Sequence, residues 1–314
     1  MTMQFAPATK KASKARIALC GPSGSGKTYT ALALATALSA KVAVIDTERG
    51  SASKYVGTNA WAFDTVTPDK FSPMSLVELL GVAAGAGYEV VVIDSMSHYW
   101  EGADGMLEQA DRRKSGGNSF SGWKEVRPDE RKMIDAILTY PGHVIVTMRS
   151  KTEYVIEEND RGKKVPRKVG MKPIQRDGIE YEFDVIGDLD HTNRMSISKT
   201  RISSLSGQVI EKPGVELAAT IADWLADGVK APTVTEYLDR ARGMSEANEL
   251  LDLYREVEAN QLLNAPTVDA EGRPTVLGDF IKSLGVQARA AAHGMPAGGQ
   301  IAAALAPAPE AGAA

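Results

Sequence analysis

The chain has 314 residues, of which 43% are apolar and 24% are charged, and its net charge is −4. This size and composition indicate one large globular domain with an appendage, and they exclude a disulfide-stapled miniprotein and a wholly disordered chain. No stretch reaches the roughly 18 apolar residues that span a bilayer, and the basic N-terminus lacks the apolar run of a signal peptide, so a cytoplasmic protein is expected. The single cysteine, Cys20, lies in an apolar run, which indicates a buried structural thiol.

Strands and helices are predicted to alternate in the first half of the chain. After a basic arm at residues 1–15, which is expected to be mobile, short β-branched runs predict strands at 17–20, 42–46, 90–94 and 143–148. Helices are predicted between them at 27–39, 73–84 and 123–139. Because near-continuous apolar strands separated by helices form parallel sheets covered on both faces, the predicted fold class is α/β.

The pattern changes after residue 148. Runs at 152–157 and 163–169 flank a turn-type cluster at 159–162 and predict a hairpin. Extended segments at 181–189 and 194–200, a turn at 206–208 and a helix at 215–225 complete a core placed at 16–228. Helical periodicity over 233–285, broken at Pro266 and at 272–274, predicts a small helical appendage. Residues 286–314 are mostly Ala, Gly and Pro, which predicts a disordered tail.

The strongest motif is a complete G-x-x-x-x-G-K-T sequence directly after a predicted strand and directly before a predicted helix. Its residues are Gly21, Pro22, Ser23, Gly24, Ser25, Gly26, Lys27 and Thr28. Glycines let backbone N–H groups converge on phosphates at a helix N-terminus, where the helix dipole favours negative charge. The motif therefore predicts that Lys27 binds the β- and γ-phosphates of ATP and that the Thr28 hydroxyl binds Mg²⁺.

Acidic residues end two other predicted strands. Asp94 follows Val90-Val91-Val92-Ile93 in a Walker B pattern, which predicts a second Mg²⁺ ligand. Asp46 ends the strand predicted at 42–46 and Glu48 follows it by two residues, and either carboxylate could orient an attacking water. These residues predict an ATP hydrolase whose cofactors are ATP and Mg²⁺.

Further motifs resemble a known family. Val-Ala-Val-Ile-Asp-Thr-Glu-Arg-Gly at 42–50 resembles the RecA strand that ends in Asp-x-Glu, and residues 144–151 resemble the strand that carries its γ-phosphate sensor. The set Ile-Asp-Thr-Glu, Ile-Asp-Ser, Thr-Met-Arg-Ser-Lys-Thr-Glu-Tyr and Ser-Lys-Thr-Arg is similar to phage ATPases of the AAA-24 type, which include the RecA-like Sak single-strand-annealing proteins. The resemblance spans 15–228, and it implies a RecA-like P-loop NTPase core with a mostly parallel sheet.

The resemblance also implies roles for particular residues. It makes Glu48 the base and Thr147 the γ-phosphate sensor. RecA has a glutamine at the position of Thr147 and uses it to couple the γ-phosphate to DNA binding, so the shorter threonine favours annealing over full strand exchange. Lys199 and Arg201 lie two residues apart on a predicted strand and share a face. By analogy with RecA filaments they would reach the γ-phosphate of a neighbouring subunit, and a surface salt bridge is the alternative.

Two basic segments lie where RecA-like folds hold single-stranded DNA. The first joins Arg112, Arg113 and Lys114 to a glycine-containing turn followed by Phe120. Cations track phosphates and aromatic rings stack bases, although a solvated loop is the alternative. The second segment, 149–176, is net positive and is either a DNA contact or a plain surface hairpin. Its candidate DNA-binding residues are Arg161, Lys163, Lys164, Arg167 and Lys168.

These features predict an ATP- and Mg²⁺-dependent ATPase that binds single-stranded DNA and promotes annealing or homologous recombination, encoded by a phage and acting in the host cytoplasm. The expected partners are single-stranded DNA, other copies of the chain in a filament or ring, and a single-strand-binding protein, with no membrane. Three alternatives use the same phosphate loop: a hexameric DNA-translocating motor of the helicase or packaging kind, a small-molecule kinase, and an ATP-gated binding module. His98 has no second His or Cys at ligand spacing, so a packing role is expected.

Overall fold

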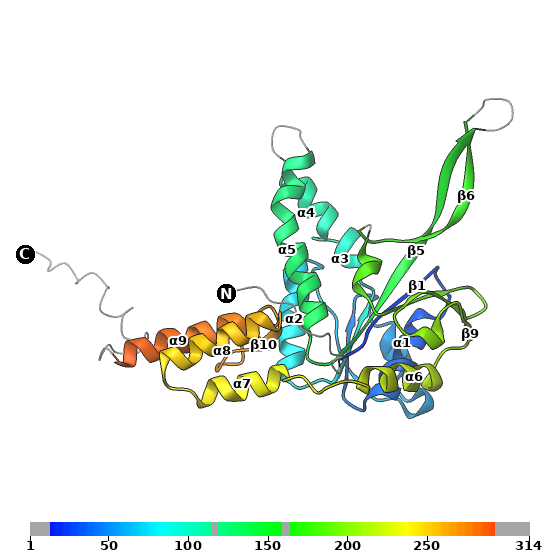
Figure 1. Ribbon diagram of the computed structural model, residues 1–314. Helices are drawn as coiled ribbons and strands as arrows, with labels where there is room; N and C mark the ends of the chain where they lie inside the picture. The colour runs from blue at the N-terminus through cyan, green and yellow to red at the C-terminus, as the bar shows by residue number, and fades with distance from the viewer. Residues whose placement is uncertain (1–12, 115–118, 159–163, 177, 293–314) are drawn as a thin grey trace, which may run out of the picture.

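The computed structural model describes residues 13–114, 119–158, 164–176 and 178–292 (Figure 1). Its main sheet has nine strands in the order β3-β2-β4-β5-β1-β7-β8-β9, with β6 paired to β5. The pairs from β3 to β7 are parallel, which confirms the predicted α/β class. The strands are β1 Arg16–Gly21, β2 Val42–Asp46, β3 Asp64–Val66, β4 Val90–Asp94, β5 His143–Glu158, β6 Lys164–Pro173, β7 Val185–Leu189, β8 Arg194–Thr200 and β9 Val209–Glu211.

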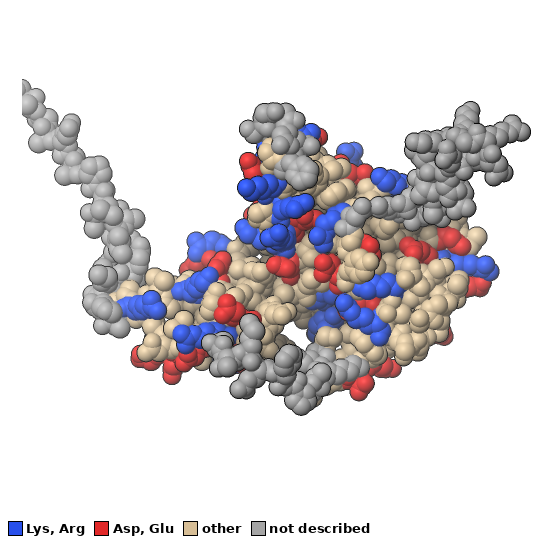
Figure 2. All heavy atoms as spheres, turned by 45° about the horizontal axis from the view of Figure 1, so that its top comes forward, with Lys and Arg blue, Asp and Glu red and all other residues tan. Residues whose placement is uncertain are grey.

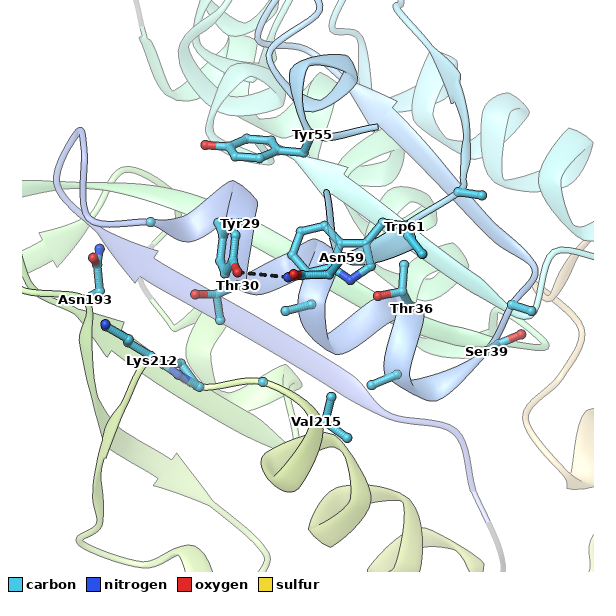
Figure 3. Close-up of a pocket in the computed structure, with 18 of the residues that line it drawn as sticks. Tyr29, Thr30, Thr36, Ser39, Tyr55, Asn59, Trp61, Asn193, Lys212 and Val215 are labelled. Carbon is cyan, nitrogen blue, oxygen red and sulfur yellow. Dashed lines mark hydrogen bonds between the residues drawn. The ribbon is translucent and has the colours of Figure 1, made fainter. Parts of the chain in front are cut away.

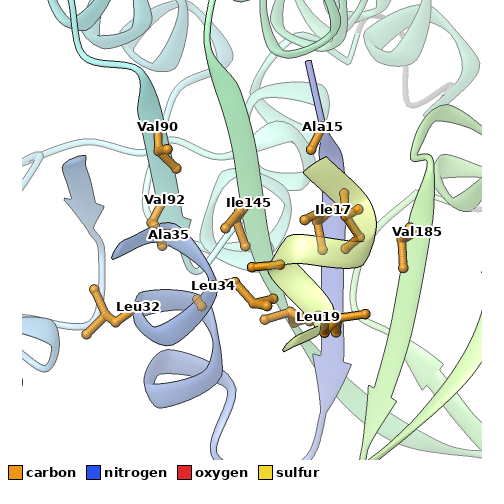
Figure 4. Close-up of a cluster of buried hydrophobic side chains, with 14 of the residues drawn as sticks. Ala15, Ile17, Leu19, Leu32, Leu34, Ala35, Val90, Val92, Ile145 and Val185 are labelled. Atoms are coloured by element: carbon orange, nitrogen blue, oxygen red, sulfur yellow. The ribbon is translucent and has the colours of Figure 1, made fainter. Parts of the chain in front are cut away.

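Helices cover both faces of this sheet. The helices are α1 Lys27–Leu38, α2 Pro73–Gly85, α3 Ser97–Glu101, α4 Met106–Arg112, α5 Ser119–Thr139 and α6 Val215–Ala226, with short 3-10 turns η1 Ala52–Tyr55, η2 Thr58–Ala60, η3 Ile179–Glu182 and η4 Ser203–Leu205. Alternate strand residues point to opposite faces. Thus Ile17 and Leu19 pack with α1 and α6 (Figure 4), whereas Ala18 and Cys20 pack with α2 and α5. Cys20 is buried, as predicted.

Strand β5 is much longer than the six residues predicted for it. Residues 144–149 pair with β1, and Ser150 to Glu158 pair antiparallel with β6. The predicted hairpin is therefore a direct continuation of a central strand, and it projects beyond the sheet on the same side as the α4–α5 arm (Figure 1). The arm has its own small core, in which Trp100 stacks on Trp123 at 5.5 Å between ring centroids.

Three predicted elements need correction. The segment predicted as extended at 181–189 begins with η3. The Lys199 ammonium stabilises this turn because it donates to the carbonyl oxygens of Glu180 and Tyr181 and to that of Phe183, the residue that follows the turn. The helix predicted from residue 123 begins at Ser119. The predicted mobile arm ends earlier than residue 15, since Ala15 is fully buried and the Ser13 N–H donates to the Leu225 carbonyl. Residues 1–12 lie outside the described residues.

The C-terminal unit is helical but also contains a hairpin. Helices α7 Val234–Gly243, α8 Ala247–Ala259 and α9 Leu277–Ala292 enclose a separate apolar core. Strands β10 Pro266–Val268 and β11 Pro274–Val276 pair antiparallel between α8 and α9 in the chain. The hairpin is missed from the sequence because each strand has three residues and begins with proline, which reads as a break. The predicted tail is also corrected, because α9 continues through residues 286–292 and only 293–314 lie outside the described residues.

The C-terminal unit packs on α2 through glycines. A Cβ atom added at Gly81 would lie 2.9 Å from the Thr267 carbonyl oxygen, and one added at Gly85 would lie 2.7 Å from Val268 Cγ1. These two positions in α2 therefore let the β10–β11 hairpin approach the helix backbone closely. Among the helices of the described residues, we find none with the length and hydropathy needed to cross a bilayer.

Candidate nucleotide site

The phosphate loop joins the carboxyl end of β1 to the first turn of α1. Gly24 and Gly26 adopt left-handed conformations, with φ of 76° and 85°, which side chains disfavour. The Lys27 ammonium curls back over the loop and donates to the carbonyl oxygens of Gly21, at 3.0 Å, and Pro22, at 2.8 Å. Burial lowers the pKa of Lys27, while the carboxylates of Asp94 and Glu48 oppose that shift.

Two features of the loop fit the triphosphate of ATP. The Ser25 hydroxyl is buried and has no hydrogen-bond partner within the described part of the chain. The N-terminus of α1 has Gly26 at its cap position and receives no side-chain cap. Unpaired donors at a helix N-terminus are the groups that bind phosphate oxygens, so the loop residues fit the ligand predicted for them.

The Walker B carboxylate lies between two hydroxyl groups. Asp94 is 2% exposed, and its Oδ2 accepts from Thr28 Oγ1 at 2.6 Å. Its Oδ1 accepts a hydrogen bond from Thr147 Oγ1. Burial raises the pKa of Asp94, and the two hydroxyl donors oppose this shift. A carboxylate beside a hydroxyl offers the hard oxygen ligands that Mg²⁺ prefers, with phosphates and water supplying the rest, so Thr28 and Asp94 fit Mg²⁺.

The structure separates the two candidate bases. Asp46 is fully buried, and its carboxylate accepts hydrogen bonds from the backbone N–H groups of Glu48, at 2.8 Å, and Ala52, at 3.0 Å. Both of its oxygens therefore hold the chain turn after β2. The Glu48 side chain is 29% exposed and lies near enough to Lys27 to affect its pKa. Glu48 is the carboxylate that faces the site.

Sequence reasoning missed a residue that contacts Glu48. Arg149 donates to Glu48 Oε1 through Nε at 3.0 Å, and to both carboxylate oxygens through Nη2 at 2.9 Å. In the sequence, Arg149 belongs to the sensor-strand motif and to the basic segment, and nothing local links it to a residue 101 positions away. His98 stacks on Phe71 and hydrogen bonds to Thr47 Oγ1 at 2.6 Å, in agreement with its expected packing role.

A cavity of about 960 Å³ opens beside the phosphate loop (Figure 3). Gly24 and Gly26 line one part of it, and α1 forms a wall. Its aromatic residues were not predicted, and they come from α1 and from the segment after β2: Tyr29, Tyr55 and Trp61. The Tyr29 and Trp61 ring centroids are 4.9 Å apart. Aromatic residues soon after a phosphate loop and after the Asp-x-Glu strand are the signal that could have found this wall.

Lys199 and Arg201 lie at the other end of the sheet. Thr200 pairs with Val185, the first residue of β7, whereas the phosphate loop follows the carboxyl end of the neighbouring β1. The Lys199 ammonium donates to carbonyl oxygens of η3, and Arg201, just beyond β8, pairs with Asp184 at 2.5 Å. Within one chain these cations do not join the nucleotide site, so contact with the nucleotide of another copy stays a prediction.

The predicted DNA-binding cations of the α4–α5 arm are paired with carboxylates of the same arm. Arg112 contacts Asp104, Lys114 contacts Asp111, and Arg113 lies 3.6 Å from Asp129. On the hairpin, β6 carries Lys164, Arg167 and Lys168. The structure does not describe the side chains of these three residues or of Phe120. Two further candidates, Arg161 and Lys163, lie wholly outside the described residues.

Comparison with known proteins identifies the core. No curated protein sequence matches the chain. The profile of the AAA_24 family, described as an AAA domain, matches residues 13–210, which run from the residues preceding β1 to the middle of β9. The matched region contains the phosphate loop, Asp94, Glu48 and Thr147, whereas the C-terminal unit lies outside it. The chain therefore belongs to the AAA_24 family of AAA domains, and its core is a nucleotide-binding ATPase domain.

Proposed function

We propose that the protein is an ATP- and Mg²⁺-dependent ATPase that binds single-stranded DNA and promotes annealing or recombination. The observation that supports hydrolysis is the arrangement of Lys27, Thr28, Asp94 and Glu48 beyond the carboxyl ends of β1, β4 and β2, which share one edge of the parallel sheet. When bound, ATP with Mg²⁺ supplies the phosphoanhydride bond and neutralises charge on the leaving phosphate. Lys27 binds phosphate oxygens, Thr28 and Asp94 hold the metal, and Glu48 orients the attacking water.

The cavity beside the loop suits the nucleoside. A purine needs an apolar slot with a few polar groups, and aromatic faces stack well on its ring. Tyr29, Tyr55 and Trp61 supply aromatic surface, while Asn193 and Lys212 supply polar groups on the opposite wall (Figure 3). The phosphates would then lie at Gly24 and Gly26, where the cavity meets the loop.

A basic face of α5 supports binding to a polyanion. Lys124, Arg127 and Arg131 are exposed, and their spacing of three and four residues places them on one side of the helix. Within the described residues none of the three forms a salt bridge, in contrast to the paired cations of α4. Figure 2 shows Lys and Arg side chains gathered on the face from which the arm and the hairpin project. Single strands are held by such cations through their phosphates.

The test measures ATP hydrolysis and binding of a fluorescent oligo-dT strand. We expect wild-type protein to hydrolyse ATP faster with the strand, and Lys27→Ala to lose nucleotide binding because the phosphate-binding ammonium is gone. The triple variant Lys124→Gln/Arg127→Gln/Arg131→Gln should bind the strand more weakly. Its slope of log affinity against log salt should be smaller by about 2, since roughly 0.7 counterion is released per neutralised phosphate of a single strand.

A matched triple variant in the C-terminal unit provides the control. Arg242→Gln/Arg255→Gln/Lys282→Gln removes the same charge from exposed positions, and it should keep wild-type affinity and salt slope. Equal losses of strand affinity in the two triple variants would show that only net charge matters, and would contradict the proposal that the α5 surface binds the strand. Annealing of complementary oligonucleotides without directional movement, together with electron micrographs of the particles, separates the proposed activity from a hexameric motor.

A further inference from the structure

Arg149 holds the carboxylate that is proposed to orient water. Its guanidinium contacts both oxygens of Glu48 at 2.9–3.0 Å. Glu48 makes no other side-chain hydrogen bond within the described residues. A carboxylate that orients water needs an oxygen lone pair aimed at that water, and a guanidinium bound across both oxygens competes for those lone pairs.

Arg149 also lies where the sheet becomes the hairpin. It is the last residue of β5 that pairs with β1, opposite Gly21 of the phosphate loop, and the next residue, Ser150, pairs with Pro173 of β6. Its carbonyl oxygen accepts from the Ile174 N–H at 2.7 Å, at the point where the chain leaves β6. The Arg149 side chain is 40% exposed. The guanidinium is therefore accessible to a ligand at the base of the hairpin while it is bonded to Glu48.

We propose that Arg149 is shared between Glu48 and a phosphate of the bound strand, so that strand binding releases Glu48 to orient water. This inference rests on the proposed function. A phosphodiester and a carboxylate offer the guanidinium the same pair of oxygen acceptors. Glu48 occupies the edge formed by Nε and Nη2, and a phosphate bound at that edge displaces the carboxylate. Because the two acceptors compete, each weakens binding of the other, and the strand becomes an activator of hydrolysis through a single side chain.

The first experiment measures oligo-dT affinity by fluorescence anisotropy without ATP, so it does not depend on hydrolysis. Glu48→Gln should bind the strand about fivefold tighter or better, the lower end of common coupling between sites, because Arg149 no longer has a carboxylate partner. Arg149→Gln should bind more weakly. Adding Glu48→Gln to Arg149→Gln should then change nothing further.

Two matched variants control for simple charge effects. Glu101→Gln removes a negative charge that also acts on Arg149 but is not bonded to it, so it should raise affinity much less than Glu48→Gln. Arg240→Gln breaks another bidentate pair, with Glu256 at 2.9 and 2.6 Å in the C-terminal unit, and should leave affinity unchanged. Equal gains for Glu101→Gln and Glu48→Gln would overturn the proposal.

The second experiment measures ATP hydrolysis with and without the strand. Arg149→Gln should hydrolyse ATP faster than wild type without the strand and should lose most of the stimulation by it. A slower basal rate would instead make Arg149 a support that orients Glu48, and would overturn the proposal. Wild-type protein that hydrolyses no ATP or binds no strand would contradict the proposed function itself. If the strand stimulates ATP hydrolysis by the wild-type protein and by the variants equally, only the proposed sharing of Arg149 is contradicted.

Discussion

The two ends of the main sheet both bury charged side chains, but they satisfy them differently. At the amino end, all five N–H donors of the Arg16 guanidinium bind backbone carbonyls, those of Ala15, Leu138, Tyr140 and Gly142. At the carboxyl end, backbone groups hold Lys27 and Asp46, whereas the partners of Asp94 and Glu48 are side chains. Asp94 is held by two threonine hydroxyls there, and Glu48 is held by Arg149.

This difference shows that a buried charge alone does not identify a functional site. Backbone carbonyls cannot leave Arg16 unless the surrounding chain unfolds, so that guanidinium belongs to the scaffold. Side-chain partners can rotate away, and their oxygens and nitrogens are then available to a ligand. Burial lowers the pKa of Arg16 to about 10, so it stays charged at neutral pH and needs every one of its partners.

The comparison predicts the largest loss of stability at the amino end. Arg16→Met should lower the free energy of unfolding by about 3 to 5 kcal/mol, because buried carbonyls lose their donors. Urea unfolding measures this effect. The folded fraction of the variant should bind ATP with wild-type affinity, and a specific loss of ATP affinity would place Arg16 in the nucleotide site.

At the carboxyl end, substitutions of the two neighbouring carboxylates, Glu48 and Asp46, should have different effects. Glu48→Gln should slow ATP hydrolysis by about a hundredfold or more and leave stability unchanged, because the water loses its orienting group. Asp46→Asn should lower the free energy of unfolding by about 1 to 3 kcal/mol, since an amide N–H₂ then faces a backbone N–H. Single-turnover hydrolysis and urea unfolding of both variants distinguish them. A hydrolysis defect confined to Asp46→Asn would reverse the assignment of the base.

The smallest expected effect concerns His143, at the amino end of β5. Its Nδ1 accepts from the Ala15 N–H at 2.9 Å, and burial lowers its pKa to about 4. In the unfolded chain His143 has an ordinary histidine pKa of about 6.5 and therefore binds a proton more readily than in the folded chain. The contribution of neutral His143 to the free energy of unfolding is therefore complete above about pH 6.5 and is lost as the pH falls toward about 4.

The free energy of unfolding should fall by about 1 to 3 kcal/mol over this pH range. The pH dependence of the urea midpoint measures this fall. His143→Gln should flatten this dependence because glutamine does not titrate in that range. The same change at exposed His191 serves as the control. If His191→Gln flattens the pH dependence of the urea midpoint as much as His143→Gln does, this dependence does not come from His143 at the amino end of the sheet.

The sequence by itself determined the local elements of the core and the nucleotide motif. Strands β2 and β4, the start of α1 and the loop from Gly21 to Thr28 were all predicted at their observed positions, because near-continuous apolar runs and the glycine spacing are local properties. Pairing of Asp94 with Thr28 follows from the same motifs. The short β10 and β11 were missed because three residues carry no periodicity.

Only the tertiary structure decided which side chains outside these motifs meet. The order β2-β4-β5-β1 brings the ends of strands distant in sequence side by side, and this order sets Arg149 against Glu48 and Thr147 against Asp94. The same topology sends Lys199 and Arg201 to the opposite end, because β8 runs antiparallel to β7. Strand order depends on how helices pack on the two faces of the sheet, over separations of a hundred residues, and no local pattern encodes it.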